Sequence, residues 1–206
     1  MLSAVPKSQE AQAGHPTWAA LLDQFYARAG MGPPLLRELE PDEVPAPYHG
    51  LLVHSRDMTP TLEAFYHQTI ALNVLSRELQ DQSYIREVVL LRTDGGGPVE
   101  YGVIRICLNH LPPVAARRVL EAERPFGNIL HSESIPHMSW PQAFFCTQSD
   151  SHMNTLLQLG QPGLLYGRRN VLLDGSRRLL AEVIEILPPV PPPRLDSRDA
   201  GDTLQR

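Results

Sequence analysis

The sequence predicts an α+β fold, a single domain in which an antiparallel β-sheet has helices packed on one face. The first reason is residues 84–108, where two runs rich in Val, Ile and Leu flank the turn TDGGGP, the pattern of a β-hairpin. The second is residues 164–188, where two further strand patterns surround Asp174-Gly175-Ser176. Helical patterns occur between the hairpins without strict strand–helix alternation, which favours antiparallel pairing.

The other elements follow from local patterns, taken in chain order. Residues 17–30 form the first predicted helix, because large apolar side chains recur there at helical spacing: Trp18, Leu21, Leu22, Phe25 and Tyr26. A short helix begins near Thr59 and Pro60, which suit a cap and a first helical position, and leads into a strand over 69–79. The composition of residues 112–123 and, more weakly, of 151–160 also favours helices.

The chain has the size and composition of one globular domain. It contains 206 residues, of which 42% are hydrophobic, enough for a sizeable core. Residues 1–16 are small and polar, and residues 189–206 combine a proline run with a charged tail. We therefore predict a flexible N-terminal extension over 1–16, a folded domain over 17–188 and a Pro-rich disordered tail over 189–206.

Charge and composition argue against several classes of partner. The net charge of −5 and the absence of a long basic run predict binding to neither nucleic acid nor an anionic membrane surface. No stretch approaches the ~18 apolar residues of a membrane span, and the N-terminus lacks a signal-peptide pattern, so we expect a cytoplasmic protein. The two cysteines and eight histidines show no metal-ligand spacing, and we expect no metal.

Arg86 and the acids of the last predicted strand are the candidate functional residues. Arg86 shares a strand face with Val88 and Leu90, which predicts an apolar environment. Its guanidinium either reaches solvent, pairs with an acid such as Glu87 of another element, or binds a ligand. On the last strand Glu182 and Glu185 lie on opposite faces, and burial would raise the pKa of either carboxyl group toward the range useful for proton transfer.

Four segments in the right order resemble one enzyme family, the chorismate pyruvate-lyases. They cover roughly residues 50–188 and read DMTPTLEAF, YIREVVLLRTDGGGP, RPFGNILHS and GLLYGRRNVLLDGSRRLLAE. The resemblance implies a chorismate lyase-like fold and a site without a cofactor. It also implies that Arg86 and the backbone amides near Met58 and Phe126, with Gly127 beside them, bind the substrate carboxylate. Arg86 and Glu182 are then the catalytic residues.

The chain departs from the family pattern at two site positions. Val103 stands where the family has an arginine, and Arg105, two residues further on the same strand face, is the expected substitute, with Arg168 as a second candidate. A count forward from the turn at Gly175 selects Glu182 as the acid, whereas a count back from the proline that ends the strand comes nearer to Glu185. We expect Glu182, because a turn sets the register of the strand after it.

The resemblance implies conversion of chorismate to 4-hydroxybenzoate and pyruvate, a carbon–oxygen lyase reaction of bacterial ubiquinone biosynthesis. Aromatisation drives this elimination, so the protein needs only to position the substrate and manage a proton. The alternative is a non-catalytic protein of the same fold that binds or senses an aromatic carboxylate, as sensor domains of bacterial regulators do. Under either reading the partner is a small molecule, and the chain is a monomer or a small homo-oligomer.

Overall fold

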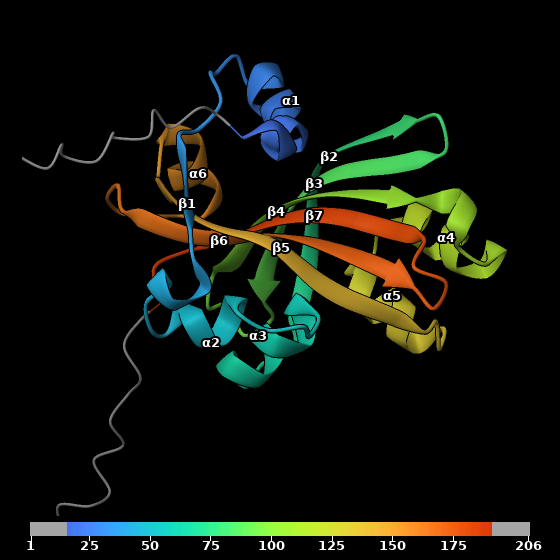
Figure 1. Ribbon diagram of the computed structural model, residues 1–206. Coiled ribbons are helices and arrows are strands. Elements are labelled where there is room, and N and C mark those ends of the chain that lie inside the picture. The colour runs from blue at the N-terminus through green and yellow to red at the C-terminus, as the bar shows by residue number, and fades with distance from the viewer. Residues whose placement is uncertain (1–15, 191–206) are drawn as a thin grey trace, which may run out of the picture.

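A seven-stranded antiparallel sheet is the centre of the computed structural model, which describes residues 16–190 (Figure 1). The strand order is β1-β5-β6-β7-β4-β3-β2. The bounds of the strands are β1 Leu36–Leu39, β2 Ile70–Gln80, β3 Ser83–Arg92, β4 Pro98–Cys107, β5 His137–Gln148, β6 Leu164–Asp174 and β7 Leu179–Leu187. Both predicted hairpins are present, as β3–β4 and β6–β7, and the predicted α+β class with one antiparallel sheet is confirmed.

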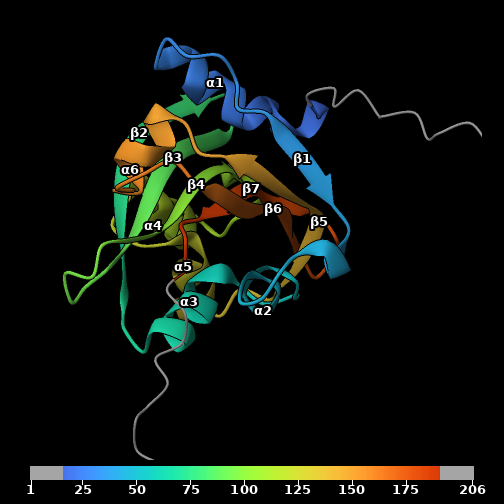
Figure 2. The ribbon, with the colours of Figure 1, turned by 90° about the vertical axis from the view of Figure 1, so that its left-hand side faces the viewer.

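Helices cover both faces of the sheet, whereas we expected them on one face. Figures 1 and 2 show α1 on one side of the sheet and α2 and α3 on the other. The bounds of the helices are α1 Ala20–Arg28, α2 Tyr48–Leu52, α3 Met58–Tyr66, α4 Pro113–Glu121, α5 Phe126–Ser132 and α6 Ser151–Leu156. The reason is the central strands, which carry apolar side chains on both faces and therefore need a cover on each.

The core is divided by the sheet. On one face, α1 and α6 pack against alternate strand residues such as Ile85, Val103 and Ile184. On the other face, α4 and α5 pack against Ile104 and Val183, and α2 and α3 form an adjoining apolar cluster. The second face holds the cavity described below, because a gap remains there between α3 and α5.

The sequence patterns did not predict β1, β5, α2 or α5. Strand β5 contains Pro141, and the pairing of β5 with β6 changes register between Pro141 and Ala143. Such a bulge accommodates a residue that cannot donate a ladder hydrogen bond. Strand β1 has only four residues and lies in a proline-rich segment.

The predicted N-terminal extension, apart from Pro16, lies outside the described residues, and so does most of the predicted tail. Residues 189 and 190 are described, and the backbone N–H of Val190 donates to the hydroxyl of Tyr48 at 3.0 Å. Within residues 16–190, no helix is long and apolar enough to cross a membrane.

Candidate functional site

A cavity opens between the second face of the sheet and the first turns of α3 and α5. Its volume, taken as the space open to the centres of water-sized molecules, is about 60 Å³. Its wall comes from the starts of the two helices: Asp57, Met58, Thr59, Pro125, Phe126 and Gly127. Its floor comes from five strands: Leu72 of β2, Arg86, Val88 and Leu90 of β3, Glu100 and Ile104 of β4, Asn170 and Leu172 of β6, and Val183 and Glu185 of β7.

Arg86 brings a buried cation with free donors to this floor. Strand alternation places it on the same face as Val88, and the side chain is 1% exposed. Among residues 16–190, one hydrogen bond, from Nη2 to the carbonyl of Arg124 at 3.2 Å, holds the guanidinium, and Nε and Nη1 have no partner. Burial lowers the pKa of Arg86 to about 10, so the group remains charged at neutral pH. Glu87, the acid considered as its partner, points to the opposite face and accepts from Tyr101.

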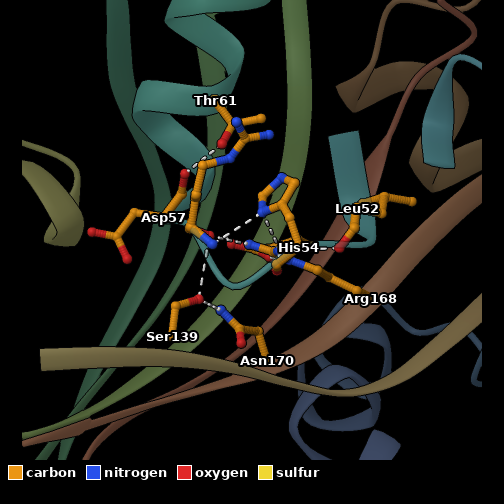
Figure 3. Close-up of polar contacts among 9 residues, drawn as sticks. Leu52, His54, Asp57, Thr61, Ser139, Arg168 and Asn170 are labelled. Carbon is orange, nitrogen blue, oxygen red and sulfur yellow. Dashed lines mark hydrogen bonds and ion pairs between the residues drawn. The ribbon is translucent and has the colours of Figure 1, made fainter. Parts of the chain in front are cut away.

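Arg168 is equally buried, but its donors are occupied. Its Nε donates to Glu185 Oε2 at 2.5 Å, its Nη1 to the carbonyls of Leu52 and His54 at 3.1 Å, and its Nη2 to the carbonyl of Arg56 at 3.3 Å. Figure 3 shows this side chain beside Leu52 and His54. Arg168 therefore ties the segment that leads into α3 to the sheet, and its charge is compensated by Glu185.

Glu100 is the third buried charged group of the floor. The side chain is 4% exposed and its Oε2 has no partner. Burial raises the pKa of Glu100 well above its usual value, and the nearby carboxylate of Glu185 raises it further, which favours the neutral form of the carboxyl group. Sequence reasoning missed this residue, although its place in β4 alternates with Gly102 and Ile104 and could have indicated the same buried face.

The first turn of α3 adds polar groups to the wall. Asp57 precedes the helix, and its side chain does not cap the first amides but accepts from His137 Nε2 at 2.8 Å. This hydrogen bond is the largest cause of a raised pKa at His137, whose Nδ1 also contacts the Ile135 carbonyl at 2.9 Å. Because helix N-termini favour anions, the backbone near Met58 suits a negatively charged ligand group.

The structure brings only some of the predicted site residues together. Met58, Arg86, Phe126 and Gly127 line the cavity as expected from the resemblance. Arg105 and Glu182 do not. They are register partners on the opposite face of the sheet, where the Arg105 Nη1 lies 3.9 Å from Glu182 Oε2.

The prediction that Glu182 shares a chamber with Arg86 is therefore wrong. Glu182 accepts from Arg169 Nε at 2.8 Å, and its own face is covered by α1 and α6. The cause is a bulge after the turn: Leu173 pairs with Leu179 and Leu172 with Ala181, so Leu180 is an extra residue. A count from the turn thus selects the wrong face, and the acid on the cavity face is Glu185.

Protonation of His54 should make the folded protein less stable in acid. Burial, together with the charges of Arg168 and Arg56, lowers its pKa to about 4 from an unfolded value near 6.5. The unfolded state binds the proton more strongly, so the free energy of unfolding should fall as the pH drops from about 6.5 to about 4. Denaturant titrations should show a smaller fall for His54→Gln than for the wild type. His131→Gln, at an exposed position, should retain the full fall, and equal pH profiles for wild type and His54→Gln would contradict the assignment.

Comparisons with known proteins agree with the fold at low sequence identity. No family model matches the chain, and no curated protein is significantly similar to it. Among solved structures, PhnF from Mycobacterium smegmatis has a TM-score of 0.51 at 12% identity, over 66% of this chain and 65% of PhnF. This chain therefore matches just under two thirds of the length of PhnF.

Two further similar structures are isolated domains. The effector domain of PhnF gives a TM-score of 0.48 at 13% identity, over 64% of this chain and 87% of that domain. The ligand-binding domain of a putative GntR-family transcriptional regulator from Bordetella bronchiseptica gives 0.45 at 9% identity, over 57% of this chain and 85% of that domain.

These findings contradict the predicted enzyme. The likeness to PhnF, at 12% identity, shows the fold alone and gives no support to a carbon–oxygen lyase. The geometry agrees, because Glu182, the expected catalytic acid, lies outside the cavity. The turnover of chorismate is therefore not part of the function that we propose.

Proposed function

We propose that the chain is a small-molecule binding protein and that its cavity takes an aromatic carboxylate. The observation that carries this proposal is the Arg86 guanidinium, which is buried, charged and supplied with a single hydrogen bond. A buried unpaired cation is costly unless a ligand compensates it. A planar carboxylate matches the fork of donors on arginine and gains strength from the low dielectric of a closed site.

The rest of the cavity supports a ring-bearing ligand. The floor around Arg86 is mostly apolar, with Val88, Ile104, Leu172 and Val183 from four strands, and Phe126 adds an aromatic wall. Apolar and aromatic walls with a few convergent polar groups are typical of small-molecule sites. The first turn of α3 supplies a positive dipole end for the same carboxylate.

The test is a comparison of matched ligands by isothermal titration calorimetry. We expect benzoate and 4-hydroxybenzoate to bind and to raise the melting temperature, as any ligand of the native state does. Methyl 4-hydroxybenzoate and benzamide, which lack the anionic group, should bind at least about tenfold more weakly, because a hydrogen bond to a charged group contributes about 1.5–3 kcal/mol. Equal affinity for the acid and its ester would refute the proposal, and so would the absence of binding by every carboxylate tried.

A further inference from the structure

Two buried side chains of the cavity floor, one basic and one acidic, have no ion-pair partner among the described residues. Glu185 is paired with Arg168, and Asp57 is paired with His137. Among residues 16–190, neither Arg86 nor Glu100 forms an ion pair, and both retain buried polar atoms without a hydrogen bond. The cavity thus holds one uncompensated donor group and one uncompensated carboxyl group.

The sheet register holds these two groups apart on the same face. Arg86 of β3 faces Ile104 of β4, and Glu100 lies four residues earlier on β4, opposite Leu90. Four residues of strand span about 13 Å, which is too far for a direct Arg–Glu pair unless both side chains turn toward each other. Both line the cavity, so a ligand in it can contact both.

Gly102 leaves room between them. It lies midway between Glu100 and Ile104 and pairs with Val88 on β3 and with Glu185 on β7. A Cβ at Gly102 would lie 3.0 Å from Glu100 Oε1 and 3.4 Å from a methyl group of Val88. The carboxyl group of Glu100 therefore lies over Gly102, in space that a side chain at this position would fill.

We propose that the ligand of this cavity carries a cationic amino group as well as a carboxylate, with the carboxylate on Arg86 and the ammonium on Glu100. This inference rests on the proposed function and makes it more specific, because the preferred ligand becomes an amino-substituted carboxylic acid. Such a ligand compensates both buried groups at once. A ligand with a carboxylate alone satisfies Arg86 and leaves Glu100 Oε2 without a partner.

Proton release accompanies binding of an ammonium group. Burial and the carboxylate of Glu185 keep the pKa of Glu100 high in the empty cavity, with Arg168 acting in the opposite direction. The other charged groups around the cavity are Arg86 and the Asp57–His137 pair. An ammonium beside Glu100 favours the ionised carboxylate, so binding lowers the pKa of Glu100 and releases protons to solvent.

Three probes of nearly equal shape test the inference: 4-(aminomethyl)benzoate, 4-(hydroxymethyl)benzoate and 4-ethylbenzoate. All three carry the carboxylate, and they differ in whether the second end is an ammonium, a hydroxyl or a methyl group. We expect the wild type to bind the ammonium probe about tenfold or more tightly than the ethyl probe. Calorimetry at pH 7 in phosphate and in Tris, whose ionisation enthalpies differ, should show release of about one proton with the ammonium probe alone.

Glu100→Gln is the matched variant, because it keeps the shape of the side chain and removes its ability to ionise. It should lose the preference for the ammonium probe and the proton release. Glu121→Gln, an exposed substitution at the end of α4, should keep both. A melting temperature at the wild-type value shows that Glu100→Gln is folded. If Glu100→Gln does not fold, the wild type alone tests the inference, through its preference for the ammonium probe and its proton release on binding that probe.

The outcomes separate this inference from the proposed function. If the three probes bind the wild type equally well and lose affinity in an Arg86 variant, the ammonium site is refuted and the carboxylate site stands. Tightest binding of the hydroxymethyl probe, or an unchanged preference in Glu100→Gln, also refutes the ammonium site. If none of the three binds, both proposals fail together.

Discussion

Replacement of Arg168 by methionine should lower the free energy of unfolding by about 3–5 kcal/mol. The side chain is fully buried, and its nitrogen atoms bind Glu185 and the carbonyls of Leu52, His54 and Arg56. Its loss leaves the Glu185 carboxylate buried without a cation and removes one donor from each of the three carbonyls. The carbonyls of Leu52 and Arg56 still accept from the His54 N–H and the Ser139 hydroxyl. Urea titrations followed by circular dichroism measure the effect.

Arg169 provides the control for this prediction. It is the next residue of β6, it points to the opposite face, and it also forms an ion pair, with Glu182, but one that is partly exposed. Arg169→Met should therefore cost no more than about 1 kcal/mol. In the double variant Arg168→Met with Glu185→Leu, part of the lost stability should return, because the unpaired carboxylate is gone. A loss for Arg168→Met no larger than that for Arg169→Met would show that Arg168 does not hold the segment before α3.

Replacement of Arg86 by methionine should have two opposite effects. Carboxylate binding should disappear, because the donors that face the cavity are removed. The empty protein should become more stable by about 1–3 kcal/mol, since the substitution removes a buried charge with unsatisfied donors and fills the same space with an apolar chain. Calorimetry with 4-hydroxybenzoate and chemical denaturation of the ligand-free protein measure the two effects.

The two measurements together distinguish an arginine that binds a ligand from one that only stabilises the fold. A structural Arg86 would resemble Arg168, and its removal would destabilise the fold. Arg37→Met applies the same chemical change at an exposed position of the edge strand β1, far from the cavity floor, and should alter neither property. If Arg86→Met were destabilising by several kcal/mol, or if it still bound 4-hydroxybenzoate at wild-type affinity, the proposed role of Arg86 would be refuted.

Arg86 shows how much of the candidate site can be predicted from the sequence. Alternation along 84–92 is enough to place this residue among buried neighbours, since a strand directs every second side chain to the same face. The TDGGGP turn is enough to pair its strand with the next one. The resemblance added Met58, Phe126 and Gly127, and the structure places all of them around one cavity.

Glu182 and Glu100 show which parts of the site could not be predicted from the sequence. The pattern of β7 has an acid on each face, and the choice between Glu182 and Glu185 depended on a single extra residue, Leu180, whose bulge no local pattern indicates. Glu100 lies in an apolar run like many strand residues. That its Oε2 has no hydrogen-bond partner among the described residues can be recognised only once Gly102, Glu185 and the surrounding strands are in place.

The sequence by itself determined the two hairpins, most helices and the burial of Arg86, because these depend on residues close together along the chain. The tertiary structure alone decided that both sheet faces are covered and that Glu185 faces the cavity in place of Glu182. It also decided that, within the described residues, Arg86 and Glu100 form no ion pair, whereas Arg168 has several partners. The physical reason is that strand register across a bulge, and the compensation of a buried charge, depend on groups far apart in sequence. A pattern within one strand contains no information about them.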